Sequence, residues 1–260
     1  MPEELNHWLD DRCAKAYWYQ HKIVPYQQLL ADTTHWLEPK PGERWLDLGC
    51  GCGRLTAALW ERSQGSLGQI VAMDCAAANA EQIAKVRKHC RAGTAEHIKF
   101  QQGNFSEGLP QFADQTIDGV VSGLAICYAE HRDPATGQFT DLAYNRLLAE
   151  LLRILRPGGT LVFSVPVPKP RFWRLFWRSI RGGFQASKPA RLLTNGLKMQ
   201  RYGSWLHRET RRGRFHYYPI EDIAARLAAV GFCDFKYRLS FADTAYVVHV
   251  RRPELAAAAA

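Results

Sequence analysis

The chain has 260 residues, of which 47% are hydrophobic and 12% aromatic, and this composition excludes an intrinsically disordered protein. Every apolar run stops short of the roughly 18 residues that a membrane-spanning helix needs. The formal net charge is +9, but thirteen basic residues and one acid fall between Pro166 and Arg214, so the basic excess belongs to one segment and the remaining chain is mildly acidic.

Short apolar runs alternate with helical patterns along the chain. After an aromatic-rich leader, strands are predicted at 44–49, 69–74, 97–102, 117–122 and 159–165, and helices at 53–63, 76–91, 140–155 and 219–230. This alternation is typical of an α/β fold with a doubly wound, mostly parallel sheet covered by helices on both faces. The final runs CDFKYRLS and TAYVVHV are separated by only three residues, so the last strand must return antiparallel to its predecessor.

We expect these elements to form a single domain. Its parts are the helical N-terminal leader (1–40), the core (41–165), a basic insertion (166–214) and a C-terminal helix with a strand pair (215–251). The seven cysteines are scattered and odd in number, which predicts reduced thiols and a cytoplasmic protein. The acidic start MPEELNHWLDD has no apolar segment, so no secretory signal is expected, and no Cys/His grouping has the spacing of a metal site.

The strand predicted at 44–49 runs directly into a glycine-rich loop. Gly49, Gly51 and Gly53 let a ligand approach the backbone at the carboxyl edge of the sheet, where open α/β folds bind ligands. The third glycine of the dinucleotide fingerprint is missing, and no Walker lysine follows. Asp47 precedes the glycines, where its carboxylate would repel a pyrophosphate but suits a ligand with an ammonium and a sulfonium group. The alternative is a glycine-rich turn without a ligand.

The next predicted strand ends in an acid, Asp74. A carboxylate at this strand end is placed to accept hydrogen bonds from both hydroxyls of a ribose. The alternative is an N-cap of the helix predicted to follow.

With these motifs, the chain resembles class I S-adenosylmethionine-dependent methyltransferases from about residue 40 to 165 and again from 215 to 251. The glycine loop of that family matches Asp47, Gly49, Gly51 and Gly53, and its ribose acid matches Asp74. The resemblance implies S-adenosylmethionine as the cofactor. It also implies a seven-stranded, Rossmann-like sheet with an antiparallel last strand.

The family's Gly-Asp element after the third strand is present here as Gly103-Asn104-Phe105. The resemblance implies that Asn104 and Phe105 bind the adenine. The amide oxygen of Asn104 can still accept from the adenine amino group, and its NH₂ can donate to a ring nitrogen. The alternative is that Asn104 only shapes a turn.

Methyl transfer from a sulfonium is an in-line displacement in which alignment can do most of the work. A base is needed only where the acceptor must lose a proton. The catalytic candidates are Tyr128 and His131, just beyond the fourth predicted strand, and the candidate substrate contacts in the leader are Tyr17, Tyr19 and His21. Each of them has a packing or surface role as its alternative.

The basic insertion contains an amphipathic pattern at 171–181. Trp173 and Trp177 share one broad arc of a helical wheel with other apolar residues, and four arginines share the opposite arc. Three interpretations stay open: a lid over the substrate, a helix on an anionic membrane surface, or an RNA contact. RNA ranks last because no separate RNA-binding module is present.

The leading function is therefore methyl transfer to a small-molecule acceptor that is lipophilic or anionic, such as a quinone, lipid or polyketide-like compound. The alternatives are an RNA methyltransferase and a non-catalytic protein that binds S-adenosylmethionine. The expected location is the cytoplasm, with membrane association through 171–181 as an option. The sequence makes no prediction of the oligomeric state.

Overall fold

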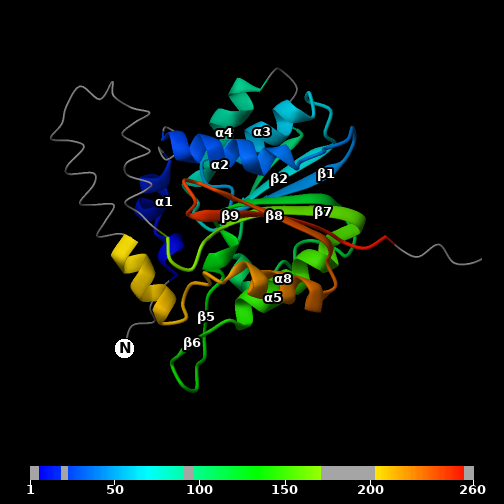
Figure 1. Ribbon diagram of the computed structural model, residues 1–260. Helices are drawn as coiled ribbons and strands as arrows, with labels where there is room; N and C mark the ends of the chain where they lie inside the picture. Colours follow the sequence, from blue (N-terminus) through cyan, green and yellow to red (C-terminus); the bar gives the residue numbers. More distant parts are fainter. Residues whose placement is uncertain (1–5, 19–22, 91–95, 171–202, 255–260) are drawn as a thin grey trace, which may run out of the picture.

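The computed structural model describes residues 6–18, 23–90, 96–170 and 203–254, without the side chains of residues 12, 16 and 17. Within these residues, a seven-stranded sheet lies between two layers of helices (Figure 1). Its strands are β1 (Arg44–Leu48), β2 (Gln69–Asp74), β3 (Ile98–Gln102), β4 (Ile117–Gly123), β7 (Leu155–Pro166), β8 (Cys233–Ser240) and β9 (Ala245–Arg251). The α-helices are α1 (Asp11–Tyr17), α2 (Val24–His35), α3 (Arg54–Arg62), α4 (Asn79–His89), α5 (Leu142–Ile154) and α8 (Ile220–Val230), and residues 203–211 are also helical.

Smaller elements follow some of the strands. They are the 3₁₀ turns η1 (His7–Leu9), η3 (Phe105–Glu107) and η4 (Ile126–Tyr128), and a hairpin formed by β5 (His131–Arg132) and β6 (Phe139–Thr140). The hairpin projects from the body of the molecule below α5 in Figure 1.

The sheet has the order β3-β2-β1-β4-β7-β9-β8. The first five strands are parallel, whereas β9 runs antiparallel to both β7 and β8, which confirms the predicted fold class and the reversal of the last strand. The chain order changes direction between β1 and β4, and in open α/β sheets the ligand crevice lies at such a switch point, outside the carboxyl ends of the strands.

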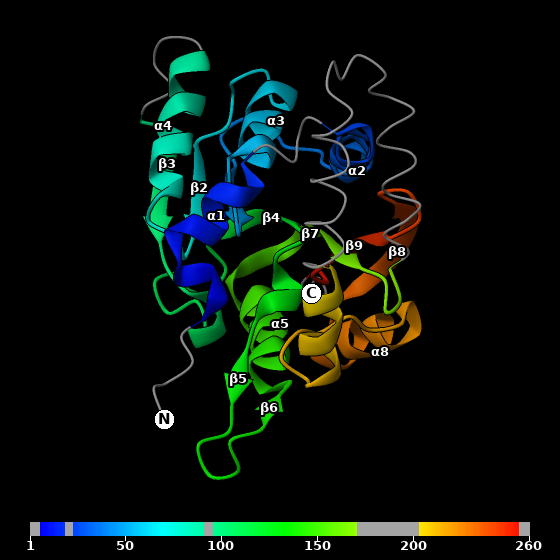
Figure 2. The same ribbon diagram turned by 90° about the vertical axis from the view of Figure 1, so that its left-hand side faces the viewer.

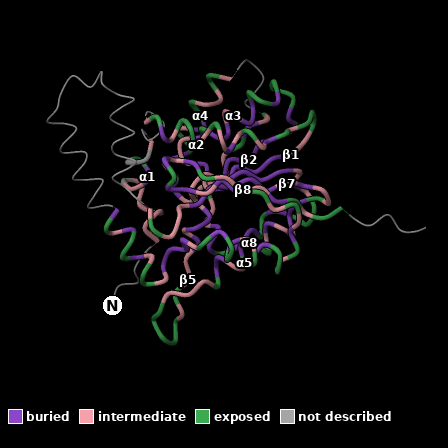
Figure 3. Tube along the Cα trace, viewed as in Figure 1, coloured by how far each residue is buried: buried purple, intermediate pink, exposed green. Residues whose placement is uncertain are grey.

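Both faces of the sheet are covered by apolar helix surfaces. On one face, α2 and α3 contribute Leu29 and Leu59; on the other, α5 and α8 contribute Leu151 and Leu227, and each of the four is at most 3% exposed. Figure 3 shows the buried residues following the sheet, with the exposed residues on the outer helix surfaces and the hairpin tip. Burial of each such side chain stabilises the fold by about 1.5–3 kcal/mol.

The helix predicted to begin at residue 76 begins at Asn79. The carboxylate of Asp74 accepts a hydrogen bond from the Ala76 amide at 3.0 Å, which folds residues 75–78 into a turn first. The N-cap of α4 is Ala78, whose own amide donates to Asp11 of α1 at 3.1 Å. Asp74 is therefore not the N-cap of this helix.

The strand predicted to begin at residue 159 begins at Leu155. Leu155 pairs with Ile117, and after a register shift the pairing resumes between Thr160 and Gly119. The shift accommodates the sequence Arg-Pro-Gly-Gly at 156–159, so β7 is one irregular strand that begins before this sequence.

Several predictions fall on residues that the structure does not describe. Tyr19, His21 and the whole segment 171–181 with Trp173 and Trp177 lie outside the described residues. Cys50, Cys52, Cys75, Cys127 and Cys233 are free thiols. No helix in the described part of the chain is both long and apolar enough to cross a bilayer.

Candidate functional site

The loop after β1 has a backbone that favours glycine. Gly49, Gly51 and Gly53 have φ angles of +72°, +49° and +74°, a region that side chains disfavour. A Cβ atom on Gly49 would lie 2.3 Å from the Cβ of Ala125, whereas a Cβ on Gly51 would have no atom of the described residues within 4 Å, apart from its chain neighbours. Gly49 is thus required by close packing, and Gly51 faces open space that a ligand can enter.

Asp74 connects this loop to the end of β2. Its carboxylate accepts hydrogen bonds from the Gly51 amide at 2.9 Å and from the Ala76 amide at 3.0 Å. Burial raises the pKa of Asp74, and these hydrogen bonds oppose the rise. The side chain of Asn79 and the amide of Cys75 also stabilise the charged carboxylate, so the hydroxyls of a ligand would share its roughly four lone-pair positions with these donors.

Asp47 is fully buried at the end of β1. Thr56 of α3 donates its hydroxyl to Oδ2 of Asp47 at 2.6 Å, whereas Oδ1 has no hydrogen-bond partner among the described residues. Burial raises the pKa of Asp47 to about 7, and the bonds from Thr56 oppose the rise. A buried acceptor without a partner is uncommon in native proteins, and a cationic ligand group would satisfy it.

Asn104 and Phe105 follow β3 beside the same loop. Asn104 caps η3, because its Oδ1 accepts from the Ser106 amide at 3.1 Å while its Nδ2 donates to Glu107 at 3.0 Å. The ring of Phe105 would lie 3.7 Å from a Cβ on Gly49. Asn104 therefore does shape a turn, and it keeps one lone pair and one hydrogen for an adenine.

Three features at the ends of β1 and β2 fit S-adenosylmethionine. The oxygen of Asp47 that has no partner among the described residues suits a cationic group, the space over Gly51 admits a ligand close to the backbone, and the carboxylate of Asp74 suits a ribose. The part of the chain that the structure covers holds no group of three or more His, Cys, Asp or Glu side chains that could bind a metal ion.

The leader contributes residues that sequence reasoning did not select. Trp18 donates its indole N–H to Asn79 at 2.7 Å, and Asn79 in turn opposes the rise in the pKa of Asp74. Tyr26 of α2 has its pKa raised by burial and by the nearby Cys52 and Asp47. The aromatic run in the leader was the only signal, and it did not favour Trp18 or Tyr26 over Tyr17.

Four rings form an aromatic wall beyond the carboxyl end of β4; they belong to Trp8, Tyr128, Trp205 and Phe215. The ring centroid of Tyr128 lies 4.5 Å from that of Trp8 and 4.9 Å from that of Phe215, and Trp205 lies 5.7 Å from Phe215. Figure 2 views this edge of the molecule, with α1 in front of the strands. Ala125 packs against Gly49, and Tyr128 follows Ala125 by three residues, so Tyr128 is near the glycine loop.

His131 is placed differently from Tyr128. It lies in β5, where its Nδ1 is 2.7 Å from the hydroxyl of Thr140, its cross-strand neighbour in the hairpin. The structure therefore joins Gly51 to Asp74 by a hydrogen bond and places Asp47 on the neighbouring strand, and it holds His131 in a separate element.

Comparison with known proteins gives a consistent result. A family model described as a methyltransferase domain matches residues 39–201. A biotin biosynthesis bifunctional protein (BioHC) of Teredinibacter turnerae is 33% identical over 144 residues, which cover 54% of this chain and 22% of that protein. A demethylmenaquinone methyltransferase of Bacillus cytotoxicus is 25% identical over 163 residues, which cover 62% of this chain and 61% of that protein.

The fold also has counterparts among solved structures. A SAM-dependent methyltransferase from Aquifex aeolicus superposes with a TM-score of 0.55 at 14% identity, covering 93% of this chain and 98% of that one. This likeness concerns the fold alone. The chain spans less than two thirds of the length of both sequence relatives.

Proposed function

Because the chain belongs to the methyltransferase-domain family, with S-adenosylmethionine as its cofactor, we propose that it transfers a methyl group to a small, lipophilic acceptor. The observation that carries this proposal is the arrangement of Asp47, Gly51 and Asp74. A buried oxygen without a partner among the described residues, an open backbone position and a carboxylate that binds the glycine loop lie within the unit formed by β1, α3 and β2.

When bound, the cofactor supplies a methyl group on a positively charged sulfur, which is an activated donor. The residues of the chain have to hold and orient it and exclude water, because in-line transfer depends mostly on alignment. Asp47 and Asp74 are the proposed anchors of the cationic and ribose ends. Asn104 and Phe105 are the proposed adenine contacts.

The aromatic wall supports a planar, lipophilic acceptor. Its rings offer large apolar faces, which bind apolar and aromatic groups by burial and edge or face contacts. The relative from Bacillus is named for a quinone acceptor, and a quinone is a compound of this type. For acceptors that lose a proton, Tyr128 and His131 are the two proposed bases, and Tyr128 is the one nearer the glycine loop. The prediction that 171–181 covers the acceptor with Trp173 and Trp177 stays part of this proposal, as does the cytoplasmic location.

The test uses cofactor with an isotopically labelled methyl group. The protein is incubated with cell extract, which is then separated into lipid, polar small-molecule and RNA fractions and examined by mass spectrometry. We expect the label in a lipophilic small molecule and none with Gly51→Val. Label in RNA would replace the proposed acceptor, and cofactor binding without any labelled product would overturn the proposed reaction.

A further inference from the structure

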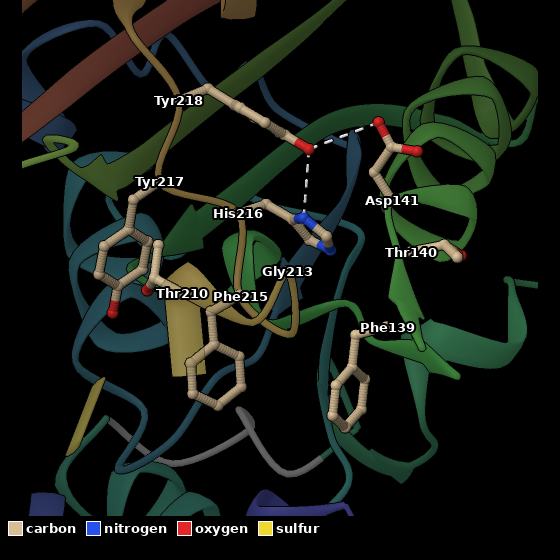
Figure 4. A pocket seen from close by; sticks show the side chains of 9 residues that line it. All are labelled: Phe139, Thr140, Asp141, Thr210, Gly213, Phe215, His216, Tyr217 and Tyr218. Carbon is tan, nitrogen blue, oxygen red and sulfur yellow. Dashed lines mark hydrogen bonds between the residues drawn. The ribbon is translucent and has the colours of Figure 1, made fainter. Parts of the chain in front are cut away.

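A cavity lies between the β5–β6 hairpin and residues 213–218. Its volume is about 300 Å³, at the lower end of the range of about 300–1,000 Å³ for small-molecule sites. The rings and polar groups that face it include those of Phe139, Asp141, Phe215, His216, Tyr217 and Tyr218 (Figure 4). We call it the hairpin pocket.

The hydrogen atoms in this pocket can be counted from its contacts. His216 is 4% exposed, and its Nε2 lies 2.9 Å from the carbonyl oxygen of Ala129. A carbonyl can only accept, so Nε2 carries the hydrogen. Burial lowers the pKa of His216 to about 4, with the bond to Ala129 opposing this, so the ring is neutral at pH 7. Its Nδ1 is therefore an acceptor.

Two acceptors share one hydrogen. The hydroxyl oxygen of Tyr218 lies 3.2 Å from Nδ1 of His216 and 3.5 Å from Oδ2 of Asp141, and Figure 4 shows it pointing toward both. A tyrosine hydroxyl has one hydrogen to donate. The shorter distance assigns this hydrogen to Nδ1 of His216, so Oδ2 of Asp141 receives no donor from Tyr218.

Asp141 keeps its charge at this position. Burial opposes ionisation, but the bond and the charge of Arg226, 2.8 Å away, lower the pKa of Asp141 overall. The guanidinium of Arg226 also lies over the ring of Tyr218, 4.3 Å from its centroid, and so fixes the orientation of that hydroxyl. An ionised carboxylate forms stronger hydrogen bonds than a neutral acceptor.

From this count and the aromatic lining, we propose that the hairpin pocket binds a neutral, planar ring that bears a hydroxyl group, that is, a phenol-type ligand. The ring packs against Phe139 and the rings of His216 and Tyr218, and the hydroxyl donates to Oδ2 of Asp141. This site goes beyond the proposed methyl transfer and does not depend on it. The pocket adjoins η4, because the amide of His216 donates to the carbonyl of Cys127 at 2.9 Å.

The first test compares two probes in direct binding measurements by calorimetry, without any turnover. Naphthol carries the donor hydroxyl, and its methyl ether has the same rings without the donor. We expect naphthol to bind at least fivefold more tightly than the ether. Equal affinities would overturn the proposal, because the pocket would then recognise only the apolar rings.

Variants then locate the site. Thr210 faces the pocket from helix 203–211, and its neighbour Arg211 is exposed. Thr210→Trp should abolish naphthol binding by filling the cavity, whereas Arg211→Trp should leave it unchanged. Naphthol binding that survives in a folded Thr210→Trp protein would place the ligand elsewhere and overturn the assignment.

A milder substitution covers the case in which Thr210→Trp does not fold. Asp141→Asn removes the charged acceptor and should lower naphthol affinity to that of the methyl ether. The matched control is Asp114→Asn, which removes a carboxylate paired with Arg153 at 2.5 Å on another surface, and it should leave affinity unchanged. An unaltered affinity in Asp141→Asn would contradict the proposed hydrogen bond.

Discussion

Replacement of Asp74 by alanine tests the cofactor site at its most connected residue. The carboxylate accepts from the amides of Gly51 and Ala76 and is proposed to accept from both ribose hydroxyls. Alanine removes these interactions together with those from the Asn79 side chain and the Cys75 amide. The bonds within the chain stabilise the free protein, and those to the ribose arise only when the cofactor is bound.

The loss of cofactor affinity and the loss of stability can be estimated separately. A hydrogen bond to a charged group contributes about 1.5–3 kcal/mol. Water can enter the space left by the carboxylate and satisfy part of the ribose, so the loss of cofactor binding should be about 2–3 kcal/mol, or roughly 30- to 150-fold in Kd. Ala76 is only 1% exposed, so its amide loses a buried acceptor and the free protein should lose about 1–3 kcal/mol of stability.

Calorimetry of cofactor binding, together with thermal denaturation of the free protein, measures both effects. The matched control is Asp118→Ala at the opposite edge of the sheet, where Asp118 accepts from the Arg44 amide at 2.8 Å and pairs with Arg156. This variant should lose stability and keep its Kd. A folded Asp74→Ala protein with the wild-type Kd would refute the ribose assignment, and so would an equal loss of affinity in the control.

Three further predictions concern the same site. Gly51→Val should weaken cofactor binding more than 100-fold, because the valine side chain fills the open space. The control is Gly42→Val, at a φ of +79° with no atom of the described residues near its Cβ. It should cost similar backbone strain, on the order of 1–3 kcal/mol, and leave cofactor binding intact in calorimetry. Burial raises the pKa of Asp47 to about 7, so the folded protein keeps a proton that the unfolded chain releases above about pH 4. Stability should therefore fall as pH rises from 4 to 7, and a denaturation series in which Asp47→Asn shows the same slope would contradict this. Trp18→Phe removes the donor to Asn79 and should weaken cofactor binding about fivefold, or roughly 1 kcal/mol; an unchanged calorimetric Kd would remove Trp18 from the site.

The part of the site that is local in the chain could be predicted from the sequence. Asp47 and the three glycines lie within seven residues, and their roles follow from strand burial and from the left-handed backbone that glycine permits. Asp74 could be predicted because parallel strands end at one edge of a sheet. The parallel strands and the antiparallel last strand could be predicted because loop lengths limit the connections.

Features that depend on distant segments could not be predicted. The aromatic wall brings together Trp8, Tyr128, Trp205 and Phe215, and no periodicity relates such positions. Tyr128 and His131 are three residues apart, so the sequence predicts the same catalytic role for both. In the structure, a cross-strand bond to Thr140 holds His131 in the hairpin. Side-chain contacts of this kind arise only after the segments have packed.

The two sites are joined by a single strained residue. Leu124 has a φ of +53°, a conformation that costs a residue other than glycine about 1–3 kcal/mol. Its amide is held by both the carbonyl and the hydroxyl oxygen of Ser164, at 3.0 and 3.1 Å, which fixes the turn out of β4. This turn places Ala125 against Gly49, and it presents the carbonyl of Cys127 to the amide of His216. The same backbone reversal therefore shapes the glycine loop on one side and the hairpin pocket on the other. The hydrogen bonds from the Leu124 amide to Ser164 stabilise this reversal.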